Sequence, residues 1–369
     1  MNQPIDQKNS ATSPEIDVVI AVHTATRPLQ RAVESCAVSK RGPRVRVTVV
    51  CHNISIQEIL HNFVIVDGVD VRFLEVHDGL NSPAGPKNAG LDAATAPYLC
   101  LLDSDDYLEP AALEHWYRVL ESAQADVVIA PVRHESGKII KTPRARPRRV
   151  ANLDPVRDGL AYATAMRGLW RADAGGTKRF RYVPELRVGE DLSPGLQIYF
   201  SGARFYYPRK GPAYVLGNEA VDRVTGNELL LAEEFRAILQ IPSVWLDSLS
   251  LRQRQSIAVK IARTSLVAAI VRRGAEHDWN NAELAAVKEL TEFLDGMAPT
   301  YDRALTVRDS KILAESLKPQ ITSELMSKAI ETYGVAGLPA TVFTVRLWDN
   351  LGRGSQLRQL VRATLDFRS

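Results

Sequence analysis

The sequence predicts an α/β fold with a mostly parallel sheet flanked by helices, followed by a mainly helical C-terminal domain. Two observations lead to this expectation. Short β-branched runs alternate with helical patterns in the first half of the chain, whereas residues 219–369 show helical periodicity and few strand signals. The length of 369 residues exceeds that of a typical single domain, and a hydrophobic content of 45% is enough for a substantial core.

Strands and helices alternate from residue 16 onward. Residues 28–39 begin with a proline and have helical spacing, and residues 110–124 repeat Leu113, Trp116 and Leu120 at the same spacing. This alternation is typical of a doubly wound, Rossmann-like sheet, in which helices connect parallel strands. The five runs expected to be strands are residues 16–22, 45–50, 69–74, 98–102 and 126–130.

A turn and a basic stretch follow the fifth strand. Residues 132–142 are expected to form a hairpin around Glu135-Ser136-Gly137. Residues 141–149 combine basic side chains with prolines and therefore cannot form a regular helix. They are interpreted either as a solvated surface loop or as a mobile rim that contacts the phosphates of a substrate.

The chain is expected to divide into three parts. Residues 1–15 are polar and are expected to be disordered. Residues 16–218 would form the α/β domain, and residues 219–369 the mainly helical domain, with helices in 252–273 and 281–295. The stretch from Gly334 mixes strand-like and helical patterns and receives no assignment.

Composition limits the partners and the compartment. The 46 basic and 43 acidic side chains nearly cancel to a net charge of +3, which argues against a nucleic-acid partner. No window is long and apolar enough for a signal peptide core or a transmembrane helix. Cys36, Cys51 and Cys100 read as buried thiols of a reducing compartment. A cytoplasmic location is expected, and peripheral membrane contact and self-association through the C-terminal domain stay open.

The strongest chemical signal is a carboxylate cluster directly after an apolar strand. Asp103, Asp105 and Asp106 follow Leu102, where the carboxyl end of a strand in an open α/β sheet forms a ligand site. Oxygen-rich clusters suit Mg²⁺ or Mn²⁺, which would bridge two phosphates. An EF-hand is rejected because the sixth position is Leu108 rather than glycine. Turn and helix-capping chemistry before the next helix is the remaining alternative.

The segment around this cluster resembles a known enzyme family. Residues 83–94 and 97–110 are similar to the stretch before and across the DxD motif of the family 2 glycosyltransferases, which have the GT-A fold. The resemblance runs from the first strand to about Leu216. It implies that Asp103 and Ser104 contact the nucleotide, that Asp105, with Asp103, holds Mn²⁺ or Mg²⁺ on the diphosphate, and that Lys87 replaces an arginine of the family.

A second motif lies further along the chain. Residues 187–196 contain the pair Glu190 and Asp191 at the start of a helical pattern. Taken alone, the position of Asp191 favours a helix N-cap over a catalytic role. The segments 168–171 and 179–185 before it resemble the approach to the family's ED motif, which implies that Asp191 is the general base and that Glu190 orients it or binds the acceptor.

The sequence also departs from the family. After the second strand the family carries two adjacent aspartates, one of which holds the base, whereas this chain has Cys51, His52 and Asn53, with His52 in the place of the second aspartate. His52 and Asn53 still offer hydrogen-bond donors and acceptors to a pyrimidine. In the first loop, the segment from Ala21 to Thr24 stands where the family often has Pro-Val-Tyr-Asn, which implies that His23 stacks on the base and that Arg27 reaches a phosphate. Taken alone, His23 reads equally as a structural residue.

The resemblance implies an inverting glycosyltransferase. Its donor would be a nucleotide-diphosphate sugar, most simply a UDP-sugar, and its acceptor a hydroxyl of a glycan or cell-surface polymer. Two alternatives stay open: a nucleotidyltransferase, which lacks here the glycine-rich loop expected after its first strand, and a non-catalytic sugar- or polymer-binding scaffold. The transferred sugar and the acceptor depend on variable loops and cannot be inferred from the sequence.

Overall fold

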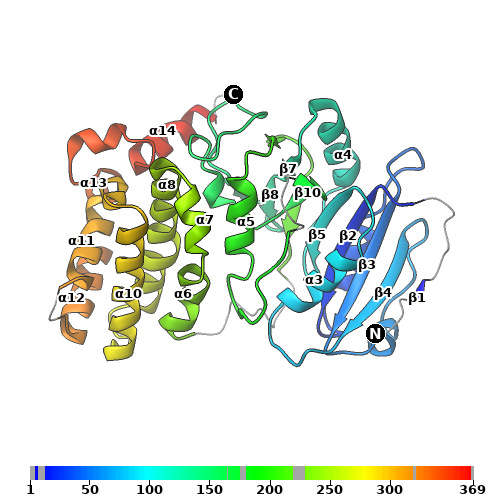
Figure 1. Cartoon of the computed structure of the whole chain (residues 1–369), viewed down its shortest axis with the longest axis horizontal. Helices are drawn as coiled ribbons and strands as arrows, with labels where there is room; N and C mark the ends of the chain where they lie inside the picture. Colours follow the sequence, from blue (N-terminus) through cyan, green and yellow to red (C-terminus); the bar gives the residue numbers. More distant parts are fainter. Residues whose placement is uncertain are drawn as a thin grey trace. The chain divides into compact units, whose positions relative to one another are not determined.

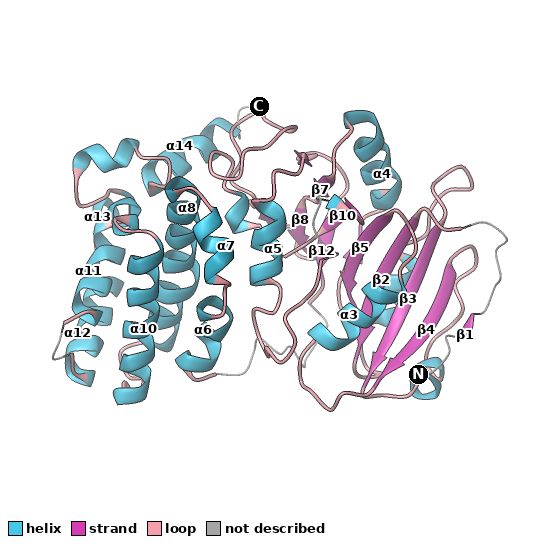
Figure 2. Cartoon of the chain, viewed as in Figure 1, coloured by secondary structure: helices cyan, strands magenta, loops and turns pink. Residues whose placement is uncertain are grey.

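The computed structural model describes residues 5–6, 13–163, 165–174, 180–218, 229–318 and 321–366. The chain forms two compact units. The first comprises the described residues of Met1–Thr142, Val150–Leu153 and Ala163–Asn227, and the second those of Pro143–Arg149, Asp154–Tyr162 and Glu228–Ser369. Strands make up much of the first unit, while the second is built from helices (Figures 1 and 2). The predicted fold class is confirmed.

The central sheet carries the first four predicted strands side by side. They are β2 (Ile16–Val22), β3 (Val45–His52), β4 (Asp70–Val76) and β5 (Tyr98–Asp103). Their spatial order is β4-β3-β2-β5, and all three pairings are parallel. β3 and β4 therefore lie on one side of β2, whereas β5 lies on its other side. Such a topological switch point opens a crevice at the carboxyl ends of β2 and β5.

Shorter strands complete this sheet. The fifth predicted strand is β7 (Val127–Ile129), and β10 (Gly168–Arg171) lies antiparallel between β5 and β7. β11 (Phe205–Tyr206) pairs with β7 in parallel. Within the segment expected to be disordered, β1 (Ile5–Asp6) pairs antiparallel with β4, while 1–4 and 7–12 lie outside the described residues.

A second sheet of four strands holds the predicted hairpin. Its strands are β6 (Tyr107–Leu108), β12 (Tyr214–Leu216), β8 (Val132–His134) and β9 (Ile139–Ile140), in that order. β8 and β9 pair antiparallel on either side of the Glu135-Ser136-Gly137 turn, as predicted. β12 pairs with β6, which begins directly after the carboxylate cluster. The second sheet therefore holds the C-terminal end of the loop that carries these carboxylates.

Helices cover the central sheet of the first unit. They are α1 (Leu29–Glu34), α2 (Ile56–Leu60), α3 (Ala84–Ala93), α4 (Ala112–Ala123) and α5 (Leu192–Tyr199). α3 packs directly on the sheet (Figure 1). The packing at Gly90 is so close that an added Cβ would lie 2.2 Å from Val19 Cγ1, so only glycine fits there. Helix α1 is shorter than predicted: the Ser35 hydroxyl bonds the Ala32 carbonyl and also accepts the Leu108 amide, which ends the helix.

The second unit is a group of helices. α8 (Leu251–Ile261), a π-helical turn (Ala262–Val267) and α9 (Ala268–Arg273) form one continuous rod over the predicted 252–273 helix. The unassigned stretch after Gly334 contains α13, η6 and α14, which are joined by irregular segments. None of the helices in the described ranges is long and apolar enough to cross a membrane. The other helical elements are η1 (Leu160–Tyr162), α6 (Leu231–Leu239), α7 (Ser243–Ser248), α10 (Asn281–Met297), η5 (Tyr301–Ala304), α11 (Val307–Ser316), α12 (Ser323–Gly334), α13 (Leu338–Val342), η6 (Leu347–Leu351) and α14 (Gln356–Asp366).

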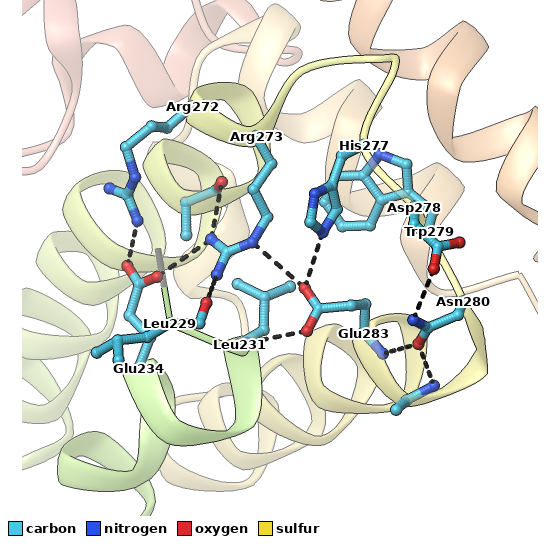
Figure 3. A network of polar contacts seen from close by, with 12 residues as sticks. Leu229, Leu231, Glu234, Arg272, Arg273, His277, Asp278, Trp279, Asn280 and Glu283 are labelled. Carbon is cyan, nitrogen blue, oxygen red and sulfur yellow. Dashed lines mark hydrogen bonds and ion pairs between the residues drawn. The ribbon is translucent and has the colours of Figure 1, made fainter. Parts of the chain in front are cut away.

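A buried charge network joins α6, α9 and α10 (Figure 3). Arg273, whose side chain is 2% exposed, pairs with Glu283 at 3.3 Å and with Glu234 at 3.1 Å. Glu283 also accepts the backbone amide of Leu231 at 3.1 Å and contacts His277 Nε2 at 3.2 Å. Because each buried charge has a partner of opposite sign, the network holds the three helices in register.

Candidate active site

Two adjoining cavities lie at the switch point of the central sheet. A larger one of about 560 Å³ contains Ala21, His23, Arg27, His52, Asn53, Ser104 and Asp105 in its wall. A smaller one of about 260 Å³ contains Glu190 and Asp191. The walls of both include Lys87, Asp103, Arg167 and Pro83. The structure therefore brings every site residue inferred from the sequence to one place, although their chemical roles stay predictions.

Asp103 and Lys87 form the boundary between the two cavities. Asp103 is the last residue of β5, opposite Ala21 of β2, and Lys87 lies in the first turn of α3. Lys87 Nζ is 2.8 Å from Asp103 Oδ1. Burial alone would lower the pKa of Lys87, but the carboxylates of Asp103 and Glu190 and the Tyr182 ring outweigh it and raise that pKa. The Lys87 ammonium is therefore a fixed positive charge beside the sheet.

The loop after β5 holds the other two carboxylates. Asp105 Oδ2 is 2.9 Å from Arg27 Nη1, and its backbone carbonyl accepts Arg31 Nη2 at 3.2 Å. Asp106 is buried and accepts the Gly217 amide at 3.0 Å. Burial, followed by the charges of Asp103 and Asp105, raises the pKa of Asp106 to about 7. Asp103 is thus paired with Lys87 and Asp105 with Arg27, and the raised pKa of Asp106 disfavours a third negative charge on this loop.

Carboxylates in this position suit a cation that is shared with a substrate. Among the described residues, no group of three or more His, Cys, Asp or Glu side chains is arranged to hold a metal alone. Mg²⁺ is commonly bound through one or two carboxylates and completed by substrate phosphates and water. Asp105, with Asp103 close by, fits that mode, because its side chain lies in the cavity wall and is 13% exposed.

The position of the missing family aspartates has an unexpected neighbour. His52 ends β3, and its Nε2 lies 2.8 Å from Asp78 Oδ1, a residue that follows β4. Asn53 adopts a left-handed conformation (φ 56°), and its side-chain oxygen accepts the Gly79 amide at 3.1 Å. Asp78 was missed from the sequence because it lies 26 residues beyond His52 and belongs to no motif. It orients the imidazole, which itself lies in the wall of the larger cavity.

Arg167 is the second residue that sequence reasoning missed. It immediately precedes β10, whose antiparallel pairing with β5 brings the start of β10 to the carboxyl edge of β5. Its Nε is buried and has no hydrogen-bond partner, and its guanidinium lies 5.4 Å from the centre of the Tyr214 ring. Burial lowers its pKa, but Tyr214, Asp103, Asp106 and Asp191 together raise it. No sequence signal indicates that β10 runs antiparallel.

Glu190 and Asp191 lie in the wall of the smaller cavity. Asp191 occupies the N-cap position of α5, yet its side chain makes no capping hydrogen bond, so capping does not account for its carboxylate. Glu190 is buried, and burial followed by the charge of Asp191 raises its pKa to about 7. A buried carboxyl group with a raised pKa beside a second carboxylate is an arrangement that acid–base catalysis uses.

The arrangement separates two chemical tasks. The larger cavity offers hydrogen-bonding groups at the end of β3 and cations around the Asp103–Asp106 loop, which suit a base and a diphosphate. The smaller cavity offers a carboxylate that no capping bond occupies, within a wall shared through Asp103. A group bound across the shared wall would have a diphosphate on one side and a proton acceptor on the other.

Comparisons with known proteins agree with this geometry. Residues 17–173 match the model of glycosyl transferase family 2. The chain is 21% identical over 244 residues to poly(ribitol-phosphate) beta-N-acetylglucosaminyltransferase TarP of Staphylococcus aureus strain N315, covering 63% of this chain and 71% of that protein. It is 29% identical over 129 residues, 35% of each chain, to the succinoglycan biosynthesis protein ExoO of Rhizobium meliloti strain 1021.

Solved structures share the fold. The crystal structure of S. aureus TarS 1–349 in complex with UDP-GlcNAc superimposes with a TM-score of 0.69 at 14% identity, over 87% of this chain and 91% of that one. The structure of the same TarS fragment in complex with UDP gives a TM-score of 0.61 at 15% identity over the same shares. The matched region spans β2 to β10, so this part of the chain is similar to the family 2 glycosyltransferases, and the fold is the GT-A fold shared with the TarS structures.

Proposed function

We propose that the chain transfers N-acetylglucosamine from UDP-N-acetylglucosamine to a hydroxyl of a phosphate-containing cell-surface polymer, with inversion at the anomeric carbon. The observation that supports this most is the pair of cavities that share Asp103, Lys87 and Arg167. The UDP-GlcNAc named for TarS and the polymer named for TarP suggest the two substrates.

The larger cavity is proposed to hold UDP. His52 and Asn53 face the pyrimidine edge, with Asp78 keeping the His52 ring in position. His23 lies in the wall near Ala21 on the same side. Lys87, Arg27 and Arg167 surround the diphosphate, and their charge-assisted hydrogen bonds contribute more to binding than a neutral contact to the base.

The reaction is proposed to be a single displacement. The acceptor hydroxyl gives its proton to the Asp191 carboxylate while its oxygen bonds to the anomeric carbon. The bond between that carbon and the diphosphate oxygen breaks, and UDP carries away the electron pair. Lys87 and Arg167 stabilise the charge that develops on the departing diphosphate, because both side chains are held in a buried setting beside Asp103.

A divalent cation, Mn²⁺ or Mg²⁺, is proposed to be held by Asp105 with Asp103. When bound, it neutralises negative charge on the diphosphate. Arg27 now pairs with Asp105, and its guanidinium would contact the phosphate oxygens once the cation takes that carboxylate.

The decisive test offers the purified protein a panel of UDP-, GDP-, dTDP- and CDP-sugars with Mn²⁺ and follows slow hydrolysis of each donor. The proposal expects UDP-N-acetylglucosamine to be hydrolysed fastest and UDP to bind more tightly than other nucleoside diphosphates in calorimetry. Preference for a purine nucleotide would contradict the donor assignment. Donor binding without hydrolysis or transfer would favour the scaffold alternative.

A further inference from the structure

The helical unit contains a cavity that the proposed reaction does not use. It has a volume of about 420 Å³, and every residue of its wall belongs to the second unit. That volume lies within the range of small-ligand sites, roughly 300–1,000 Å³. Five arginines line it, together with a single acidic side chain, Asp349: Arg144, Arg252, Arg303, Arg353 and Arg362.

These five arginines come from separate parts of the chain. Arg144 belongs to the basic proline-containing stretch, and Arg252 to the first turn of α8. Arg303 lies in η5, Arg353 between η6 and α14, and Arg362 in α14. The five arginines are therefore not a run of charges along one exposed helix. Folding of the second unit brings their guanidinium groups around one cavity.

In the described part of the chain, the recorded contacts of these guanidinium groups are with an aromatic ring and a backbone carbonyl. Among the described residues, none of the five forms an ion pair with a carboxylate. Arg144 lies 4.4 Å from the centre of the Tyr162 ring, and Arg362 donates to the backbone carbonyl of Arg157 at 2.9 Å. The nearby carboxylate of Asp158 is already bound by Arg146, whose Nη2 lies 2.6 Å from its Oδ2.

Neighbouring positive charges act on two of the cavity arginines. Burial lowers the pKa of Arg144, and the neighbouring charge of Arg263 lowers it further. Burial likewise lowers the pKa of Arg362, and the positive charges of Arg358, Arg146 and Arg353 lower it further. Asp158 raises this pKa, but its effect is smaller than the sum of the others. A bound anion would remove this repulsion, and guanidinium groups bind phosphate oxygens in a bidentate manner.

We propose that this arginine cavity binds phosphate groups of a non-aromatic phosphate polymer. Several positive charges around one cavity match more than one phosphate. Nucleic acid fits less well, because bases stack on exposed aromatic faces. Of the two tyrosines in the wall, Tyr162 is covered by Arg144 and Tyr301 is 2% exposed. The inference rests on the proposed function only for the source of the phosphates, which would be the acceptor polymer.

The test measures binding to the full chain with the donor cavity saturated by UDP and Mn²⁺. The probes are inorganic tripolyphosphate, an oligomer of glycerol phosphate, a neutral dextran of similar length and an oligouridylate. The double variant Arg303→Gln/Arg353→Gln removes two exposed cavity arginines. Arg346→Gln/Lys288→Gln removes the same charge from exposed side chains of the same unit outside the cavity.

The wild type is expected to bind the glycerol phosphate oligomer and not dextran. The cavity variant should lose roughly tenfold or more in affinity, since hydrogen bonds to charged groups are strong. The control variant should lose much less, and both should bind UDP normally. Tight binding of tripolyphosphate alone would assign the site to free phosphate compounds.

Three outcomes would overturn the inference. These are no binding of either phosphate probe by the wild type, equal losses in the cavity and control variants, and binding of oligouridylate that is as tight as that of the glycerol phosphate oligomer. None of these outcomes depends on sugar transfer. Failure of the donor panel with intact phosphate binding would contradict the proposed function and leave this cavity assignment standing.

Discussion

Asp191 and Glu190 are neighbouring carboxylates with different surroundings. Asp191 has no capping bond to the helix that it precedes, while Glu190 is buried behind it with a pKa raised to about 7 by burial and by Asp191. A base that is free of structural hydrogen bonds is available to an acceptor hydroxyl. The two residues are therefore expected to respond differently to substitution.

Asp191→Asn is expected to lower kcat by a factor of roughly 10² to 10⁴, with donor affinity little changed, because a general base acts in the transition state. Steady-state kinetics and UDP calorimetry on the same preparation check both parts. The matched control is Asp173→Asn, an exposed carboxylate of the same unit whose side chain is 77% exposed. A kcat near that of the wild type would reduce Asp191 to a structural residue.

Glu190→Gln should change how stability depends on pH. The folded-state pKa of Glu190 lies near 7, above its value of about 4.5 in an unfolded chain, so the folded state binds the proton more tightly. Its stabilising contribution is full below the unfolded pKa and is lost as pH rises toward 7. The difference in Tm between the variant and the wild type should therefore shift in favour of the variant as the pH rises from 5 to 8. Parallel Tm curves would contradict the raised pKa.

Asp105→Ala is expected to abolish metal-linked donor binding and to leave the fold intact, since Asp105 lies in the loop after β5, where its side chain pairs with Arg27 at the cavity wall. Calorimetry of UDP with and without Mn²⁺ measures this. In the wild type, chelation should remove transfer. Transfer that is unaffected by chelator in both proteins would exclude the cation from the mechanism.

At the scale of elements, tertiary contacts decide where several segments end and what they hold. Asn280 is the N-cap of α10, and its side chain accepts the amides of Ala282 and Glu283. This start places Glu283 against Arg273 of α9 and the first residue of α6 (Figure 3). Three helices that are separate in sequence thus depend on one carboxylate.

Glu283→Ala is expected to destabilise the protein by roughly 3–5 kcal/mol, because it leaves Arg273 buried with less compensation. Urea unfolding followed by circular dichroism measures the change. The control is Lys288→Gln, which breaks an exposed pair with Glu292 and should cost at most about 0.5 kcal/mol. Similar losses in the two variants would show that the network contributes little.

At the scale of the whole molecule, the two units are interleaved in sequence. Segments 143–149 and 154–162 lie within the first half of the chain but belong to the helical unit. Their apolar residues Leu160 and Ala161 are fully buried, and η1 packs against α8. A division of the chain at residue 218 therefore separates these segments from the helices that bury them.

A protein that ends at Asn218 should consequently be less stable than the same unit within the full chain, because Leu160 and Ala161 become exposed. Limited proteolysis should cut it within 143–162, where the full chain resists, and mass spectrometry of the fragments identifies the sites. Equal resistance of both proteins would show that these segments fold without the helical unit.

Much of the first unit follows from local sequence. The strands of the parallel sheet are β-branched runs buried on both faces, so their positions are visible as patterns, and Asp103 and Asp105 stand out as charges directly after such a run. The resemblance to a family supplied Asp191 and Lys87. Periodicity also located the rod of α8 and α9 and helix α10.

Contacts between distant segments were invisible in the sequence, because no local pattern encodes which strand or loop lies beside which. The antiparallel insertion of β10 brings Arg167 into the site, and the parallel pairing of β3 with β4 brings Asp78 to His52. The arginine cavity likewise depends on five segments that meet only in the folded helical unit. Sequence determined which chemical groups this protein has, whereas long-range packing decided which of them act together.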